Sequence, residues 1–384
     1  MDGYRSPWLD VDLELLRDST RKFFERECVP HDARWRREGM ADSEIWRKLG
    51  TMGLLCASIP EQYGGGGGSF AHEAVICTEQ ARALVTCFSN NVHSGILAHY
   101  LLNFGGEEQK LKWLPRMATG ELVGAIAMSE PGAGSDLQAI RTSAVRQGDE
   151  YLINGSKTFI TNGYHANLIC VAVKTDPTQR AKGVSLIMIE TDGLAGFRRG
   201  RLLEKIGQTG QDTAELFFDD LRVPAANLLG TREGCGFIQL MEQLPRERML
   251  IALQAAVIME RAVAETTAYV AERKLFGKRL LDMQNTRFKL AECKTIATIA
   301  RIFVDSCVMR VLDGTLDAPT AAMAKWWSTQ MNCQVLDECL QLFGGYGYMS
   351  EYPIARMYAD SRVGKIYGGA NEVMKELIAR SMEP

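Results

Sequence analysis

The chain contains 384 residues, of which 46% are hydrophobic, with 44 basic and 47 acidic side chains and a formal net charge of −3. A chain of this length usually forms two or three packed substructures. The near-neutral charge, without a long basic run, removes the electrostatic basis for nucleic-acid binding, and no window holds the roughly 18 uninterrupted apolar residues that a membrane span needs. The composition therefore predicts a soluble protein that acts on a small molecule.

The cysteines and the amino terminus bear on the cellular compartment. Ten cysteines occur without a CxxC pair, many of them inside apolar helical runs. This pattern argues against a zinc site or a disulfide framework and favours reduced thiols. The amino terminus has no basic segment followed by an apolar stretch, so no targeting peptide is expected. These features predict a cytoplasmic protein with no metal site.

The first part of the chain has helical patterns. Leu13, Leu16, Phe23 and Phe24 recur at the spacing of helical turns. Further apolar runs with this spacing are IWRKLGTMGLL, FAHEAVICTEQARAL and VHSGILAHYLLNF. We predict an N-terminal α-helical domain over residues 1–121.

The pattern changes to short β-rich runs in the middle of the chain. These runs are VGAIAM, YLI, KTFI, NLICVAVK, GVSLIMIE and AELFFDD, with turn residues between them. Asn154-Gly155, set between YLI and SKTFI, is typical of a hairpin turn. We predict a small antiparallel β-barrel or sandwich domain over residues 122–235.

Long helical patterns return in the last part of the chain, at about 238–273, 285–312 and 319–343. Helices, then strands, then helices indicate an α+β chain of three consecutive domains. We predict that the last domain, residues 236–384, is an up-and-down four-helix bundle.

The stretch LPRERML, residues 244–250, places an acid at the start of an almost wholly apolar helix. Pro245 suits either the first turn of this helix or a kink. Steps of a helical turn lead from Glu247 to Ile251 and on along an apolar stripe, so we expect the carboxylate near the core. Taken alone, the stretch favours a structural ion pair with Arg246 or Arg248 over a functional acid.

Two turn segments contain candidates for ligand contacts. AMSEPGAGSD, residues 127–136, follows a predicted strand, and its glycines allow the backbone to approach a phosphate or a ring edge. It fits neither the dinucleotide-binding pattern nor the P-loop, and alone such a turn is more often a plain loop. In NGSKTFITNG, residues 154–163, Phe159 and Thr161 lie two apart and so on one face of a strand, where core packing is the commoner explanation.

Five segments, in their order along the chain, resemble the acyl-CoA dehydrogenases over essentially the whole length. They are MSEPGAGSD, INGSKTFITNG, ERKLFGKRL (272–280), QLFGGYGYMSEYPIARMYADSR (341–362) and IYGGANEVMKELIAR (366–380). The resemblance implies the helix–sheet–helix fold of that family and FAD-dependent desaturation of fatty acyl-CoA thioesters between Cα and Cβ. It also implies a homotetramer built as a dimer of dimers.

The resemblance implies positions for FAD as well. Ser129 should lie at the N5/O4 edge of the flavin, Phe159 should cover the isoalloxazine, and Thr161 should place a hydroxyl at the flavin edge. The residues expected to hold the FAD of a neighbouring subunit are Arg273, Phe276, Gln284, Gln341 and Gly345. The other expected FAD contacts are Met128, Gly134, Ser135, Ala370 and Glu372. Ala370 departs from the threonine that the family favours, which puts one FAD hydrogen bond in doubt.

The sequence departs from the commonest family pattern at the catalytic position. Many members carry YEGT, whose Glu is the catalytic base, but this chain has Tyr367, Gly368, Gly369 and Ala370. LPRERMLIA instead resembles the long-chain subset, in which the base lies on a helix of the C-terminal bundle. The resemblance therefore makes Glu247 the expected base, and a glycine at 368 leaves room beside the substrate for its carboxylate.

The same resemblance implies the remaining contacts and partners. The backbone N–H of Gly368 should bond the thioester carbonyl, and Ser135, Arg248 and Tyr367 are the other expected substrate contacts. Burial should raise the pKa of Glu247, and Arg248 should lower it. The expected substrate is a medium- or long-chain acyl-CoA, and the expected electron acceptor is electron-transferring flavoprotein. Open alternatives are a branched or terpenoid acyl-CoA of the isovaleryl or citronellyl type, an oxidase or monooxygenase on the same fold, and a non-enzymatic scaffold.

Overall fold

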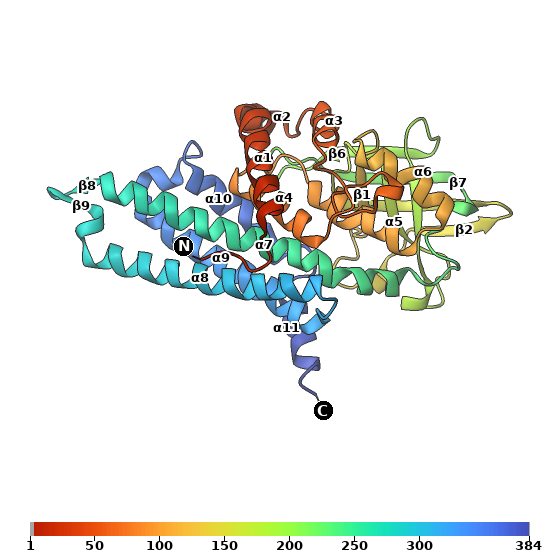
Figure 1. The fold of residues 1–384 in the computed structure, drawn as a ribbon. Coiled ribbons are helices and arrows are strands. Elements are labelled where there is room, and N and C mark those ends of the chain that lie inside the picture. The colour runs from red at the N-terminus through yellow and green to blue at the C-terminus, as the bar shows by residue number, and fades with distance from the viewer. Residues whose placement is uncertain (1–3, 384) are drawn as a thin grey trace.

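The computed structural model describes residues 4–383 and places a β-sheet between two groups of helices (Figure 1). The long helix α7 (Gly236–Glu272) spans the molecule. The sheet lies near one end of α7, and a two-stranded hairpin, β8 (Lys274–Leu275) and β9 (Lys278–Arg279), forms the opposite tip. These two ends are therefore far apart within one chain.

The N-terminal helices pack on α7, with α4 in direct contact with it. Eleven of the thirteen residues of α4 are buried, which is typical of a helix enclosed on all sides. Asp10 caps α1 by accepting a hydrogen bond of 2.8 Å from the backbone N–H of Leu13. The helices are α1 (Val11–Glu27), α2 (Asp32–Glu38), α3 (Glu44–Thr51), α4 (Phe70–Arg82), α5 (Ala98–Phe104) and α6 (Glu107–Ala118), and a π-helical segment, Asn91–Leu97, leads into α5.

The middle of the chain forms one seven-stranded sheet of order β1-β4-β2-β3-β7-β6, with β5 paired to β4. The predicted β-domain is confirmed, but its sheet is mixed, because β4 runs parallel to both β1 and β2. The long connection between β1 and β4 allows this parallel pairing. The strands are β1 (Gly124–Ala127), β2 (Ser143–Gln147), β3 (Glu150–Thr161), β4 (Leu168–Lys174), β5 (Val184–Glu190), β6 (Phe197–Leu202) and β7 (Thr213–Pro224).

The hairpin predicted at Asn154-Gly155 is wrong, because β3 continues through both residues between β2 and β7. Gly155 has φ 146° and lies at an irregularity in the register with β7. A Cβ on Gly155 would lie 2.6 Å from Oγ1 of Thr142, so the glycine permits a close approach between strands. The turn between β2 and β3 lies at Gly148, which has φ 64°.

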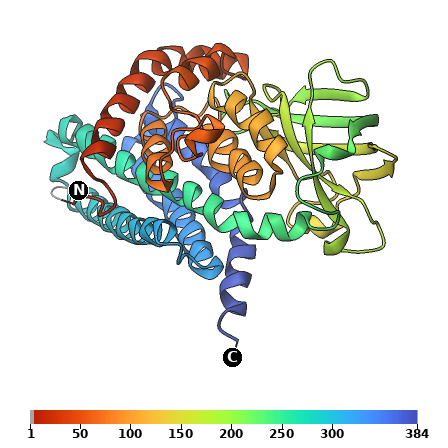
Figure 2. The ribbon, with the colours of Figure 1, turned by 45° about the vertical axis from the view of Figure 1, so that its right-hand side comes forward.

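The C-terminal part is helical, as predicted, and the long helices α8 (Gln284–Leu312) and α9 (Ala318–Phe343) pack on α7. Two short helices, α10 (Pro353–Ser361) and α11 (Asn371–Arg380), pack on α9. Pro245 lies inside α7, past its first turn, so the first-turn interpretation is wrong. Both views show α11 projecting from the body of the molecule (Figures 1 and 2). The predicted domain boundaries at residues 121 and 235 stay predictions.

Helix α7 joins the layers. It contacts α4 and α5 of the N-terminal part, β5 of the sheet and α8 and α9 of the bundle. Figure 2 shows α5 and α6 packed against the sheet, where Leu101 and Trp113 share a core with Cys170 and Leu186 of the strands. Between residues 4 and 383, none of the helices combines the length and apolar character that crossing a bilayer requires.

Candidate active site

Glu247 lies on α7 in a dry environment. Its side chain is 4% exposed, and the hydroxyl of Tyr100, on α5, donates a hydrogen bond of 2.8 Å to its Oε1. Burial raises the pKa of Glu247 to about 7, although the Tyr100 hydrogen bond and the charges of Arg248 and Arg246 oppose the rise. A carboxyl group with this pKa can accept a proton near neutral pH.

The two arginines beside Glu247 have other partners. Arg246 Nη2 lies 2.7 Å from Oε2 of Glu73, and its Nη1 donates to the carbonyl of Gly95 at 2.7 Å. Arg248 Nε lies 3.4 Å from the carbonyl oxygen of Gly368. Among residues 4–383, neither arginine forms an ion pair with Glu247, so the interpretation of Glu247 as a structural ion-pair partner is wrong.

Arg246 belongs to a polar network centred on the buried carboxylate of Glu73 on α4. Burial opposes ionisation of Glu73, but Arg246 and His99 lower its pKa to about 2. His99 Nε2 lies 2.8 Å from Oε1 of Glu73, and Ser58 also bonds this carboxylate. Glu73, and not Glu247, is therefore the ionic partner of Arg246 among residues 4–383.

The loop that carries Gly368 passes close to α7. Gly368 has φ 64°, and a Cβ there would lie 2.4 Å from Cδ1 of Ile251, one turn beyond Glu247. Lys325 of α9 is fully buried and donates to the carbonyl of Gly369 at 2.7 Å, and burial lowers its pKa to about 8. The loop is thus fixed beside the helical face that carries Glu247. Among residues 4–383, no acceptor takes the backbone N–H of Gly368, which leaves that donor available to a ligand.

The turn after β1 is tied to β3 by a buried lysine. Lys157 Nζ lies 2.9 Å from the carbonyl oxygen of Met128 and 2.8 Å from Oε1 of Glu130. The backbone N–H of Thr158 donates to the carbonyl of Ser129 at 3.0 Å. Burial lowers the pKa of Lys157 to about 8, against the attraction of Glu130. The structure therefore brings Met128 and Ser129 next to the strand that carries Phe159 and Thr161.

The side chain of Phe159, next to this turn, is exposed to solvent. Its side chain is 70% exposed, its backbone has φ 60°, and Ile160 beside it is buried. Phe159 and Thr161 thus share the more open side of β3, as predicted, and Phe159 is not a core residue. Gly134 and Ser135 are exposed, and a Cβ on Gly134 would meet no atom within 4 Å. An exposed aromatic ring beside an open glycine turn fits a planar ligand with a phosphate group.

The other expected FAD residues lie elsewhere. Phe276, 89% exposed with φ 52°, lies in the β8–β9 tip, and the Arg273 guanidinium lies 5.6 Å from the ring centre of Tyr346. Gln284 begins α8, and Gln341 and Gly345 lie at the exposed end of α9. This group faces the end opposite the sheet, so one chain does not bring it to Phe159 (Figure 1). Ala370 and Glu372 lie at the start of α11, where Ala370 makes no side-chain cap and Glu372 is exposed.

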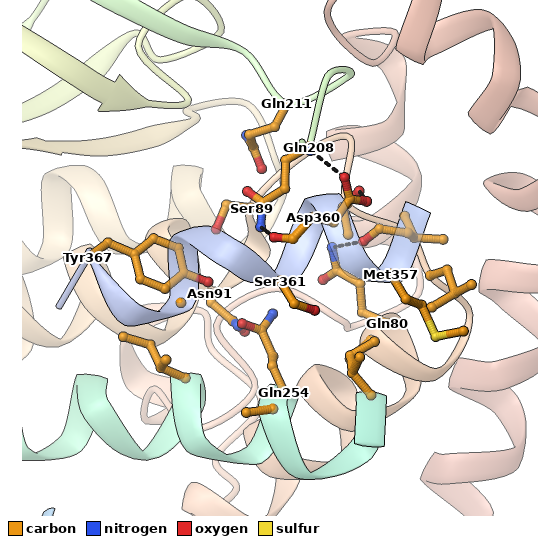
Figure 3. Close-up of a pocket in the computed structure, with 18 of the residues that line it drawn as sticks. Gln80, Ser89, Asn91, Gln208, Gln211, Gln254, Met357, Asp360, Ser361 and Tyr367 are labelled. Carbon is orange, nitrogen blue, oxygen red and sulfur yellow. Dashed lines mark hydrogen bonds between the residues drawn. The ribbon is translucent and has the colours of Figure 1, made fainter. Parts of the chain in front are cut away.

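A cavity of about 980 Å³, part of it open to solvent, lies between α4, α7, α9 and α10 (Figure 3). Its lining includes Thr161 of β3 and Tyr367, next to Gly368. Along α7 it is lined by Ile251, Gln254 and Ile258. Ile251, one turn beyond Glu247 on α7, thus lines the cavity and also lies beside Gly368.

Sequence reasoning missed three positioning residues. Tyr100 lies within an apolar helical run, which gives no signal for its bond to Glu247. Lys157 is the first residue of the predicted strand KTFI, and nothing in the sequence pairs it with Glu130. Lys325 is the single charge in the run AAMAKWW, and that isolation was a signal for a buried lysine.

Three family models match consecutive parts of the chain. Residues 11–121 match the N-terminal domain of acyl-CoA dehydrogenase, residues 125–221 its middle domain and residues 234–383 its C-terminal domain. The chain belongs to the acyl-CoA dehydrogenase family. Acyl-CoA dehydrogenases are oxidoreductases and FAD flavoproteins, and the exposed Phe159, the open turn at Gly134 and the unpaired N–H of Gly368 in residues 4–383 fit a bound flavin and thioester.

Several known acyl-CoA dehydrogenases are similar to this one. The mitochondrial long-chain specific acyl-CoA dehydrogenase of Sus scrofa is 47% identical over 371 residues, which cover 96% of this chain and 86% of the relative. The crystal structure of an acyl-CoA dehydrogenase from Geobacillus kaustophilus is 46% identical, with a TM-score of 0.97, and the match covers 99% of this chain and 100% of that one. A glutaryl-CoA dehydrogenase from Mycobacterium smegmatis, in complex with FADH2, is 26% identical with a TM-score of 0.90, and the match covers 98% and 95% of the two chains.

Proposed function

We propose that this acyl-CoA dehydrogenase oxidises a medium- or long-chain fatty acyl-CoA thioester to the trans-2-enoyl-CoA, with Glu247 as the catalytic base. The observation that carries the proposal is the carboxyl group of Glu247, which is 4% exposed, has a pKa raised to about 7, and is held by Tyr100 on the helical face next to Gly368. The 47% identity with a long-chain specific relative supports the chain-length class.

The residues of this chain divide the proton chemistry between them. Glu247 takes the proton from Cα of the thioester, and the N–H of Gly368 donates to the carbonyl oxygen, where negative charge develops. Tyr100 holds the carboxylate in place from the protein side. Arg248 and Lys325 hold the carbonyl groups of Gly368 and Gly369. FAD, when bound, supplies the acceptor for the hydride that leaves Cβ.

FAD is held on two sides in this proposal. Met128, Ser129, Gly134, Ser135, Phe159 and Thr161 hold the flavin and pyrophosphate of one subunit. Arg273, Phe276, Gln284, Gln341 and Gly345 reach the same cofactor from a neighbouring subunit, and Ala370 and Glu372 contact it at the start of α11. The distance between the two groups within one chain supports this division (Figure 1).

We infer a homotetramer, with electron-transferring flavoprotein as the electron acceptor. The other proposed substrate contacts are Ser135, Arg248 and Tyr367. The ten free cysteines support a reducing compartment such as the cytoplasm.

Anaerobic mixing of the yellow holoenzyme with a panel of acyl-CoA thioesters tests the proposal. The expected result is bleaching of the flavin by straight-chain thioesters, with formation of the trans-2-enoyl-CoA. Bleaching confined to branched thioesters would move the substrate to the isovaleryl or citronellyl type. Stoichiometric oxygen consumption on admission of air would indicate an oxidase, and no bleaching by any thioester would overturn the proposed activity.

A further inference from the structure

The cavity beside α7 has a polar centre. Asn91, Gln254 and Ser361 come from the π-helical segment, α7 and α10, and their side chains point toward one another in the cavity (Figure 3). Asn332 of α9 also lines it and is 4% exposed. Four separate elements therefore contribute amide or hydroxyl side chains to the lining of one cavity.

These polar groups lack protein partners. Among residues 4–383, the Gln254 amide and the Ser361 hydroxyl form no hydrogen bond, and Asn332 Oδ1 is buried without a partner. Asn91 donates only a weak contact of 3.4 Å to the sulfur of Cys77. Asn332 is buried, whereas Asn91, Gln254 and Ser361 are half-buried, so their polar atoms can bond water or a ligand. The arrangement therefore fits a ligand that brings its own donors and acceptors.

The charged side chains of the cavity are already paired. Arg356 Nη1 lies 2.9 Å from Oδ2 of Asp32, and Asp360 Oδ2 lies 2.8 Å from Nη2 of Arg36. The groups that remain available at the centre are neutral. A neutral hydroxyl or keto group matches them, because a carboxylate at the centre would find no unpaired cation among the charged side chains that line the cavity.

The cavity also has apolar walls on both sides of this centre. Ile251 lies on the side of Gly368, while Leu84, Ile258 and Met357 line the cavity elsewhere. Gln254 is three residues beyond Ile251, which places it about 4.5 Å further along the axis of α7. An acyl chain that runs from Gly368 along α7 would therefore pass methylene groups by Ile251 before it reached the polar centre.

We propose that this cavity is the distal acyl pocket and that it selects acyl-CoA thioesters with an uncharged hydroxyl or keto group within the chain, a few carbons beyond Cβ. The inference rests on the proposed dehydrogenase function. An unsubstituted chain would displace water from Asn91, Gln254 and Ser361 without replacing its hydrogen bonds, and a site built for hydrogen bonding discriminates strongly against the analogue that lacks the group. An oxygenated chain restores those bonds.

The test measures anaerobic flavin bleaching with matched thioesters of one length: unsubstituted, and with a hydroxyl or keto group at successive interior carbons, plus one with a terminal carboxylate. The expected result is a bleaching rate constant divided by Kd at least tenfold higher for one hydroxyl or keto position than for the unsubstituted chain. Equal values for all the uncharged thioesters would overturn this inference while leaving the dehydrogenase function intact. A preference for the carboxylate would also overturn it.

Gln254→Leu sharpens the test, because leucine keeps the size and helix propensity of glutamine without its amide. This variant should lose at least tenfold of the preference and bleach faster with the unsubstituted thioester. Ser361→Ala, a smaller change, should lower the preference in the same direction and covers the case in which Gln254→Leu misfolds. Gln334→Leu, at an exposed position on α9, is the control and should keep the parental ratio. An unchanged ratio in both cavity variants would contradict the proposal.

Discussion

The two halves of the proposed active site are built differently. On the base side, Glu247 and Tyr100 are 4% and 0% exposed, and their contacts come from one chain. On the cofactor side, Phe159 and Phe276 are 70% and 89% exposed and lie toward opposite ends of the molecule. The comparison teaches that the contacts of one chain are sufficient to raise the pKa of Glu247, whereas the residues proposed to hold the cofactor are not brought together within one chain.

Replacing the base should give the largest effect. Glu247→Gln keeps the size of the side chain but cannot accept the proton, so flavin reduction by acyl-CoA should fall by roughly 10²- to 10⁴-fold. FAD content and thioester affinity should change little, because the cofactor side is separate. Stopped-flow bleaching measures the rate. Glu242→Gln, at an exposed position on the same helix, is the control and should keep the parental rate. A Glu247→Gln enzyme within threefold of the parent would remove the distinction between the two halves.

The buried base should also lower stability at high pH. Its pKa rises from 4.5 in the unfolded chain to about 7 in the folded protein, so the folded state binds more protons between these values. The free energy of unfolding should therefore decrease as pH rises from about 4.5 to 7, by at most about 3 kcal/mol. Denaturant unfolding of the parent and of Glu247→Gln across this range measures the difference. Parallel curves for the two proteins would contradict a raised pKa.

Arg273 tests the cofactor side. Arg273→Ala should weaken FAD retention about 10- to 100-fold, because a charge-assisted bond to a phosphate would be lost, while the fold stays intact. Arg279→Ala is the matched control, since Arg279 lies on the same tip but is paired with Asp282 at 2.7 Å. Flavin content after dilution and gel filtration is the measurement. Equal retention in the two variants would argue against a role for the tip in cofactor binding.

Tyr100 should give the smallest effect. Its hydrogen bond opposes the rise of the Glu247 pKa, so Tyr100→Phe should move the pH midpoint of flavin reduction upward by up to about one unit and slow the reaction at neutral pH by up to tenfold. Tyr63→Phe is the control, because the hydroxyl of Tyr63 bonds Glu107 instead. A downward shift of the midpoint in Tyr100→Phe would contradict the proposed arrangement of the base.

The sequence was sufficient for the order of the elements and for the burial of Glu247. Long apolar periodicities predicted α7, α8 and α9, because these helices are buried along much of their length. The prediction of a hairpin at Asn154-Gly155 was wrong because Gly155 lies within β3, where the absence of a side chain allows Thr142 to approach the strand closely. A local turn signal cannot distinguish these two uses of glycine.

The site could be predicted only where its residues carry a local motif. Gly368 stands in such a motif, and the structure gives a reason for it, since a side chain there would meet Ile251. Tyr100 and Gln254 approach the site from elements far apart in the sequence, so their roles depend on tertiary packing. The partner of Arg246 is Glu73, 173 residues away, which no local pattern reveals.

The most direct test of Glu247 as the base follows proton removal alone. A thioester without hydrogens on Cβ, such as 3,3-dimethylbutanoyl-CoA, cannot complete the oxidation, so exchange of its Cα hydrogens in ²H₂O reports only the base. The parent enzyme and Glu242→Gln should incorporate deuterium at Cα, with a rate that rises with pH through about 7, and Glu247→Gln should incorporate it at least 10²-fold more slowly. Exchange by Glu247→Gln at the parental rate would contradict the assignment of Glu247 as the catalytic base.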